Sequence, residues 1–357
     1  MKYSSLKYDE LQGCAFVKTG LMMLVLIYHS LLFWGGEWFG KPIDSAPEFD
    51  FLSQWLNTFH IFGFSFVSGY LFYFLKIENG KYPHFGSFIA GKAKRLLIPY
   101  FFVLTVWVIP FQQLFLPINA KKLFEKYILA TAPSQLWFLL MLFTVFVVFF
   151  PLSNFLKKHT VLGLLIFLLA YFSEKVLSPY IPNLFCIFRT LNHLIVFWLG
   201  FKYRQFKDTK IVNFIRKIPA PLFLLSHLGL FTLRFFLVAY NDIAIIQLLN
   251  YGLLLLLRAG GAIMIFNVLQ KVSAKVPAEC PLFKCVSKCG MPIYLFHQQL
   301  IYVFLYFLNG VIHPHLLAPI IAVCVFLIST VLSLILLKFK TTSFLIGEKY
   351  ITRKKSE

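Results

Sequence analysis

Residues 134–153 read SQLWFLLMLFTVFVVFFPLS, a run without one charged side chain. The hydrocarbon core of a bilayer is about 30 Å thick, and a helix needs roughly 20 apolar residues to cross it. The stretch therefore predicts a membrane-spanning helix. Similar stretches follow one another along the chain, separated by short polar breaks, at 17–35, 55–75, 95–117, 160–178, 184–201, 217–240, 243–268, 290–309 and 316–337.

The composition agrees with this pattern. Of 357 residues, 59% are apolar, 19% are aromatic and only 13% are charged, against about 25% charged in ordinary soluble domains. Residues 1–16 show no small-residue cleavage site, so we expect the first span to be retained and not removed as a signal peptide. We predict an all-α polytopic bundle of about ten spans, with one membrane domain at 1–340 and a short basic tail at 341–357.

The net charge of +20 is explained by topology. Basic residues fall mainly in alternate connections and in the tail, which by the positive-inside rule places both termini in the cytoplasm. This distribution argues against nucleic-acid binding. Three lysines of a predicted outer loop break the pattern, so that loop is an interfacial helix or the span count is wrong there: Lys121, Lys122 and Lys126.

Three of the six cysteines cluster in a predicted cytoplasmic loop, at Cys280, Cys285 and Cys289. Their spacing is not CxxC and the loop holds no histidine, so we favour reduced thiols over a zinc site and predict no metal.

Ionisable side chains inside spans are costly and are typical of functional sites. The spans contain four histidines and three arginines with almost no carboxylate, and a bound anion would neutralise the arginines: His29, His60, Arg189, His193, Arg234, Arg258 and His297. His29 follows Lys18 by eleven residues, or about 16 Å along a helix, which places it in the outer half of the membrane. His60 opens the second span from the outer side and can share a level with His29.

Six motifs in order resemble the membrane acyltransferase family 3, and most closely its fucose O-acetyltransferase-like branch. They are VKTG running on to YHS at 17–30, FHIF and FVSGYLF at 59–72, KRLLIPY at 94–100, LWFL at 136–139, RTL followed by FWLG at 189–200, and YLFH at 294–297.

This resemblance implies transfer of an acyl group, typically acetyl, from cytoplasmic acyl-CoA to a sugar hydroxyl of a surface or lipid-linked glycan. His29 would act as the general base or as a covalent acyl carrier. His60 is the second catalytic candidate and would orient His29 or the acceptor. The phosphates of CoA suit cationic side chains, and the candidates are Lys18, Arg95, Arg189 and Arg258.

Two further residues are candidates for binding the acceptor. Trp137 offers a flat apolar face to a sugar, although an interfacial anchor explains it equally well. His297 has either a structural role or a place in the site. The motif Ser68-Gly69 predicts close helix packing.

A transporter or flippase for a lipid-linked glycan or another anion is the alternative function, although no duplicated half is visible. Short loops indicate a bacterial inner membrane. Nothing in the sequence bears on the oligomeric state.

Overall fold

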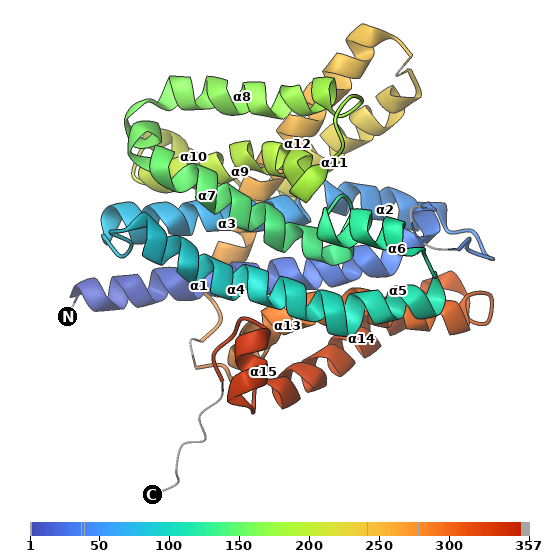
Figure 1. The fold of residues 1–357 in the computed structure, drawn as a ribbon. Coiled ribbons are helices and arrows are strands. Elements are labelled where there is room, and N and C mark those ends of the chain that lie inside the picture. Colours follow the sequence, from blue (N-terminus) through green and yellow to red (C-terminus); the bar gives the residue numbers. More distant parts are fainter. Residues whose placement is uncertain (1, 37, 39, 241, 278, 351–357) are drawn as a thin grey trace, which may run out of the picture. The chain divides into compact units, whose positions relative to one another are not determined.

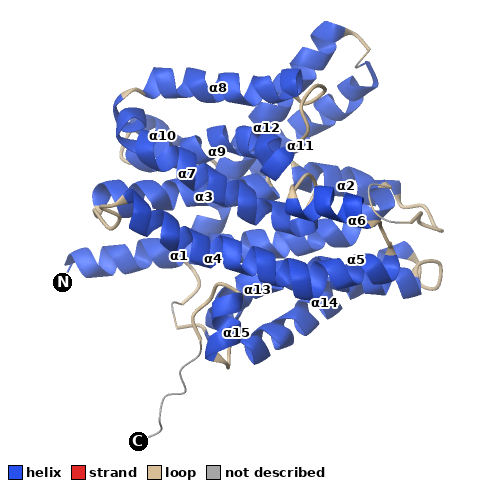
Figure 2. Ribbon diagram, viewed as in Figure 1, coloured by secondary structure: helices blue, strands red, loops and turns tan. Residues whose placement is uncertain are grey.

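The computed structural model describes residues 2–36, 38, 40–240, 242–277 and 279–350. These residues form helices and connecting loops without a named strand (Figure 2). Figure 1 shows the helices coloured in their order along the chain. The chain divides into two compact units, each built from separated segments. Unit 1 comprises residues 1–28, 50–81 and 195–287, and unit 2 comprises 29–49, 82–194 and 288–357.

Ten helical stretches of the described residues are long and apolar enough to cross a membrane. The predicted all-α bundle of about ten spans is therefore confirmed. The α-helices run as follows: α1 (Lys2–Leu31), α2 (Pro47–Asn57), α3 (His60–Phe72), α4 (Phe85–Val103), α5 (Ile109–Phe115), α6 (Ala120–Leu123), α7 (Trp137–Lys158), α8 (Thr160–Leu177), α9 (Ile187–Gln205), α10 (Lys210–Lys217), α11 (Ala220–Leu237), α12 (Ala244–Ser273), α13 (Pro281–Leu308), α14 (Pro314–Leu336) and α15 (Lys340–Leu345).

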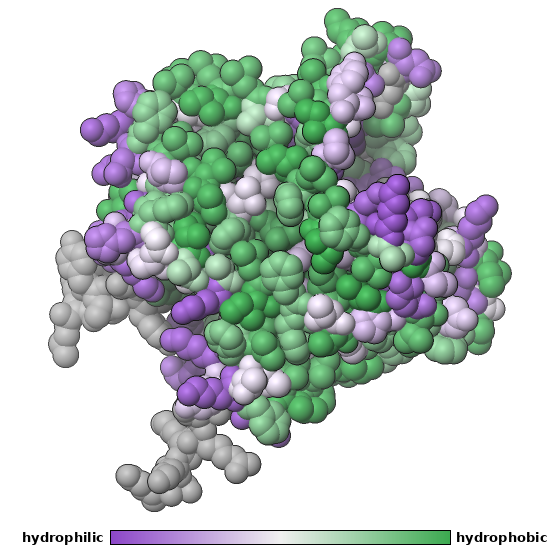
Figure 3. Space-filling view, viewed as in Figure 1, coloured by the Kyte–Doolittle hydropathy of each residue, from purple (hydrophilic) through white to green (hydrophobic). Residues whose placement is uncertain are grey.

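Many large apolar side chains of the spans are exposed, especially on α8, α11 and α14. Figure 3 shows hydrophobic residues across most of the visible face. A soluble protein rarely exposes a large contiguous apolar surface, whereas lipid tails cover it without cost. The chain is accordingly an integral, multi-pass membrane protein.

Several helices are longer than predicted, and three groups of residues that the predicted spans leave in connections lie within helices. Lys92 and Lys94 lie within α4, Lys202 and Arg204 lie within α9, and Cys285 and Cys289 lie within α13. The hydrophobic pattern underestimates the length of these helices because charged residues near their ends interrupt it. Part of the predicted tail, at 351–357, lies outside the described residues.

Unit 1 shows why charges are tolerated at one of these ends. Arg204 is 4% exposed and lies 2.9 Å from a carboxylate oxygen of Glu10. Its Nε and Nη2 atoms donate to the two oxygens of Glu78 at 2.9 and 2.7 Å, and Tyr70 donates to Glu10. We call Arg204, Glu10, Glu78 and Tyr70 the Arg204 network. Glu10 is the first residue of one candidate span and Glu78 is the last residue of another, so the charges at these helix ends neutralise one another within the unit.

Two glycines allow α3 and α9 to pack closely in unit 1. A Cβ atom at Gly69 would overlap the backbone carbonyl of Phe197, and one at Gly200 would overlap the carbonyl of Phe66. Small residues at facing positions let helix backbones approach in a membrane. The packing role predicted for Ser68-Gly69 is therefore confirmed at Gly69.

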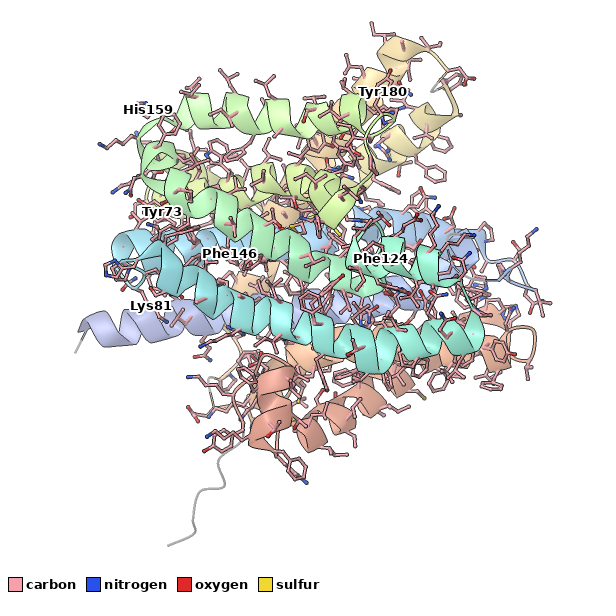
Figure 4. The ribbon with its side chains drawn as sticks, in the orientation of Figure 1. Tyr73, Lys81, Phe124, Phe146, His159 and Tyr180 are labelled. Atoms are coloured by element: carbon pink, nitrogen blue, oxygen red, sulfur yellow. The ribbon has the colours of Figure 1, made fainter. Side chains whose placement is uncertain are left out.

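In unit 2, α4 packs beside α7, and α7 beside α8. Figure 4 shows His159 at one end of α7 and Phe124 near the other end. Phe124 begins the π-helical segment Phe124–Ile128 (η4), which continues α6. The three exceptional lysines therefore belong to a short helical segment outside the candidate spans, at the end of α7 opposite Lys157 and Lys158.

Candidate active site

Two of the predicted histidines meet in unit 2. His29 lies near the end of α1 and His297 lies within α13, and Nε2 of His297 is 3.2 Å from Nδ1 of His29. His297 is 1% exposed, and its Nδ1 is 2.7 Å from the backbone carbonyl of Tyr294. A carbonyl only accepts hydrogen bonds, so Nδ1 of His297 carries a proton.

This contact sets the tautomers of the pair. When His297 is neutral, its Nε2 accepts a hydrogen bond, and Nδ1 of His29 must donate it. The lone pair of His29 is then on Nε2, the nitrogen on the other side of its ring. The indole of Trp38 stacks on the His29 ring with centroids 5.6 Å apart. An oriented imidazole with a lone pair on one defined nitrogen is the arrangement that a general base or nucleophile requires.

Two glutamines bind α13 to the segment that precedes α7. The side-chain nitrogen of Gln135 donates to the Leu295 carbonyl at 2.8 Å and to Oε1 of Gln299 at 2.7 Å. The hydroxyl of Tyr294 donates to the Gln135 carbonyl. Gln135 and Gln299 are 3% and 2% exposed, so these bonds satisfy amides that burial would otherwise penalise. They also fix the turn of α13 that carries His297.

The loop before Gln135 has an uncommon backbone. Ser134 and Ala130 adopt positive φ angles of 53° and 52°, as do Phe185 and Cys186 in a second loop. The two loops are joined: Phe185 donates to the Leu129 carbonyl at 2.9 Å, and Cys186 donates to the Ala130 carbonyl at 3.2 Å. Left-handed conformations are uncommon for residues other than glycine and gather at functional sites.

The structure brings Arg189 and Trp137 together at the same end of α7. The guanidinium carbon of Arg189 lies 4.4 Å from the Trp137 ring centroid, a cation–π contact. The ring of His193, one turn further along α9, lies 5.6 Å from Trp137. A candidate donor-binding residue and a candidate acceptor-binding residue are thus neighbours.

The second catalytic candidate, His60, belongs to unit 1. It begins α3, is buried, and its Nδ1 lies 2.7 Å from the Leu56 carbonyl. Its ring packs against Tyr28 with centroids 4.4 Å apart. Because His29 is in the other unit, the expectation that the two histidines share a level stays a prediction.

The remaining cationic candidates have separate surroundings. In unit 1, Lys18 lies in α1 and is partly exposed, and the guanidinium carbon of Arg258 lies 4.7 Å from the Phe62 ring centroid. In unit 2, Arg95 is exposed and forms an ion pair with Glu348 at 3.3 Å. Within unit 2, therefore, the contacts of Arg95 and Arg189 involve different segments.

A cavity of about 290 Å³ lies beside the histidine pair in unit 2. Trp38, which stacks on His29, forms part of its wall, and so does Gln298, the residue after His297. Lys126 and Gln112 also line it, and the Lys126 ammonium donates to the Gln112 side-chain oxygen at 2.8 Å. Burial lowers the pKa of Lys126.

The family model of acyltransferase family 3, described as an acyltransferase domain, matches residues 15–338. The chain belongs to this family. With its ten candidate spans it is a membrane acyltransferase, and the matched range includes His29, Trp137 and His297. Neither the curated proteins nor the solved structures gave a match.

Sequence reasoning on this acyltransferase missed the cavity residues and the glutamines. One signal was available, since His297, Gln298 and Gln299 are three consecutive polar residues inside an apolar span. Each needs a hydrogen-bond partner in the membrane. No comparable signal marks Gln112 or Trp38, because their roles depend on which distant segments surround them.

Proposed function

We propose that this membrane acyltransferase is an O-acyltransferase that moves an acyl group, most simply acetyl, from cytoplasmic acyl-CoA to a hydroxyl of a surface or lipid-linked glycan. The observation that carries the proposal is the contact between His29 and His297 beside a cavity. A sugar hydroxyl is a weak nucleophile at neutral pH, and an oriented imidazole can remove its proton as attack begins.

In the direct reaction, the hydroxyl oxygen attacks the carbonyl carbon of the thioester. The new C–O bond forms, the C–S bond breaks, and the hydroxyl proton passes to Nε2 of His29. That proton then goes to the departing thiolate, which leaves as CoA thiol. In the covalent alternative, Nε2 of His29 attacks the thioester carbonyl, the C–S bond breaks and CoA leaves as the thiolate. The hydroxyl then attacks the acyl-imidazole, the C–N bond to Nε2 breaks, and the hydroxyl proton is released to the thiolate. His297 holds His29 in its tautomer in both.

Donor binding follows from the chemistry of CoA, whose phosphates favour cationic side chains. We assign this role to Lys18, Arg95 and Arg258, and we place both termini in the cytoplasm on the distribution of basic residues. Arg189, the fourth candidate for donor binding, contacts Trp137 at the other end of α7 from Lys157 and Lys158, so it would contact the acyl end of the donor and not its phosphates. The position of Lys121–Lys126 at the opposite end of α7 from Lys157 and Lys158 supports an outer location for the cavity. The motif order favours the fucose O-acetyltransferase-like branch, and the short loops favour a bacterial inner membrane.

The test is acyl transfer by purified protein in lipid nanodiscs, with radiolabelled acetyl-CoA and a membrane glycan fraction as acceptor. We expect His29→Ala to lower transfer about 10²- to 10⁴-fold, the usual range for a general acid–base group. His313→Ala is the matched control, because this histidine is exposed and stacks only on His315. Full transfer by His29→Ala would refute the assignment. Glycan flipping without transfer, unaffected by His29→Ala, would support the transporter instead.

A further inference from the structure

Among the residues that the structure describes, one cationic side chain and no acidic one line the cavity beside the histidine pair. Its polar lining consists of the Lys126 ammonium, side chains of Gln112, Gln298 and Gln299, and hydroxyl groups that include Tyr302. We propose that this cavity binds one sugar ring of the acceptor, and that the ring carries a carboxylate, as a hexuronic acid does. The inference rests on the proposed function, because it names the substrate class of that same site.

The size of the cavity argues for a single ring. Pockets for drug-sized ligands measure about 300 to 1,000 Å³, so about 290 Å³ lies at the lower limit. CoA, with its nucleotide and its pantetheine arm, is far larger than one sugar. The cavity therefore suits the acceptor and not the donor.

The walls combine flat apolar faces with amide groups. Trp38 and Tyr302 meet edge to face with centroids 4.7 Å apart, and Phe111 and Phe115 stack one turn apart on α5 at 5.8 Å. Gln298 donates to the Tyr302 hydroxyl. Aromatic walls with a few placed polar groups are typical of small-molecule sites, and a sugar offers both apolar C–H faces and hydroxyl groups to such a lining.

The positive charge of Lys126 indicates that the sugar ring in the cavity carries a negative charge. Lys126 donates to Gln112, whose side-chain oxygen also accepts from the Tyr127 hydroxyl at 2.9 Å. Neutral groups alone thus hold the ammonium within hydrogen-bond distance, and no ion pair to Lys126 occurs among the described residues. An ammonium has three N–H donors, so two can serve a ligand. A carboxylate would complete its coordination and return the electrostatic stabilisation that burial removes.

The cavity is also well placed for the reaction. Trp38 separates it from the His29 ring, on which that indole stacks, and Gln298 follows His297 directly. A ring whose carboxylate contacts Lys126 is thus held one indole away from His29, and the hydroxyl that reacts must reach His29 past the edge of Trp38.

The experiment measures binding without any acyl donor, by ligand-observed NMR titration of the protein in nanodiscs. The probes are methyl glucuronide and methyl glucoside, which differ in the carboxylate alone. We expect the glucuronide to bind at least about tenfold more tightly, since hydrogen bonds to charged groups are the stronger ones. Lys126→Met should abolish this preference and Lys126→Arg should keep part of it. Lys121→Met, an exposed lysine on the preceding turn, should leave it unchanged.

Equal binding of both probes by the native protein, or a preference that survives Lys126→Met, would overturn the inference. The outcome is separable from that of the proposed function. Acyl transfer to a neutral glycan without carboxylate preference refutes only the substrate class. A carboxylate preference in a protein that transfers no acyl group supports the cavity and refutes the transferase reaction.

Discussion

The two units contain cations with contrasting environments. In unit 1, the Arg204 side chain is buried between Glu10 and Glu78, and every group of the network has a partner within it. In unit 2, the partly buried Lys126 is held by an amide oxygen and faces a cavity to which the described residues contribute no acidic side chain. Charges that are neutralised internally hold helices together, whereas a cation left with neutral neighbours at a cavity is suited to an anionic ligand. The contrast separates structural from ligand-binding charge in one chain.

The largest expected effect is on stability, and it comes from a variant that disrupts the Arg204 network. Arg204→Met leaves two carboxylates without their cation, and removing one partner of a buried ion pair typically costs about 3 to 5 kcal/mol. Since both carboxylates are about one-quarter exposed, we expect about 3 kcal/mol, measured as a loss of thermal stability in nanodiscs. Lys210→Met, at the exposed start of α10, is the control. An unchanged melting temperature would contradict the structural role.

His297→Ala acts on the histidine pair of unit 2, and the loss of activity should exceed what its loss of stability explains. Without His297, the His29 tautomer is no longer fixed, and we expect transfer to fall about 100-fold, within the range for acid–base contributions. His297→Asn should recover part of the rate, since an amide oxygen can accept from Nδ1 of His29. Comparable losses in both variants, with lowered melting temperatures, would mean that His297 is only a packing residue.

Gln135→Leu removes the side chain that holds α13 against the segment before α7. The Leu295 carbonyl and the Gln299 amide then lose partners, and we expect transfer to fall about tenfold as the His297 turn loosens. The readout that identifies positioning is the pH–rate profile, which should shift because His29 is less well oriented. A Ser153→Ala variant, whose hydroxyl bonds only within α7, should keep the native profile.

Arg189→Met should give the smallest effect. Arg189 is exposed, and one contact of an exposed cation with a ligand is worth at most about 1 kcal/mol, so we expect the KM for acyl-CoA to rise at most about fivefold with kcat nearly unchanged. Lys175→Met, at the exposed end of α8, should not alter KM. A lowered kcat with an unchanged KM would remove Arg189 from donor binding and place it at the reacting groups.

The spans could be predicted from the sequence because length and hydrophobicity decide membrane crossing. The ends of the spans could not be predicted. Hydropathy counts Glu10, Glu78 and Arg204 against a helix in the membrane and cannot show that their charges neutralise one another in the folded unit. For the same reason, the sequence shows the candidate residues but not how they come together in the site. His29 and His297 are visible as histidines in spans, but 268 positions separate them, and only folding reveals their contact. Lys126 was visible only as an exception to the charge pattern.

Two π-helical segments contribute to the cavity wall. Val108 ends the segment Leu104–Val108, and Lys126 and Tyr127 lie in the segment Phe124–Ile128. A π-turn accommodates one residue more than an α-turn, and one residue rotates a helix by about 100°. Deleting a single position from 104–108 would restore regular winding and swing Gln112 and Phe115 away from Lys126. A one-codon change could thus reshape the cavity while leaving the membrane spans intact, and under the proposed function it would change which acceptor the cavity accommodates.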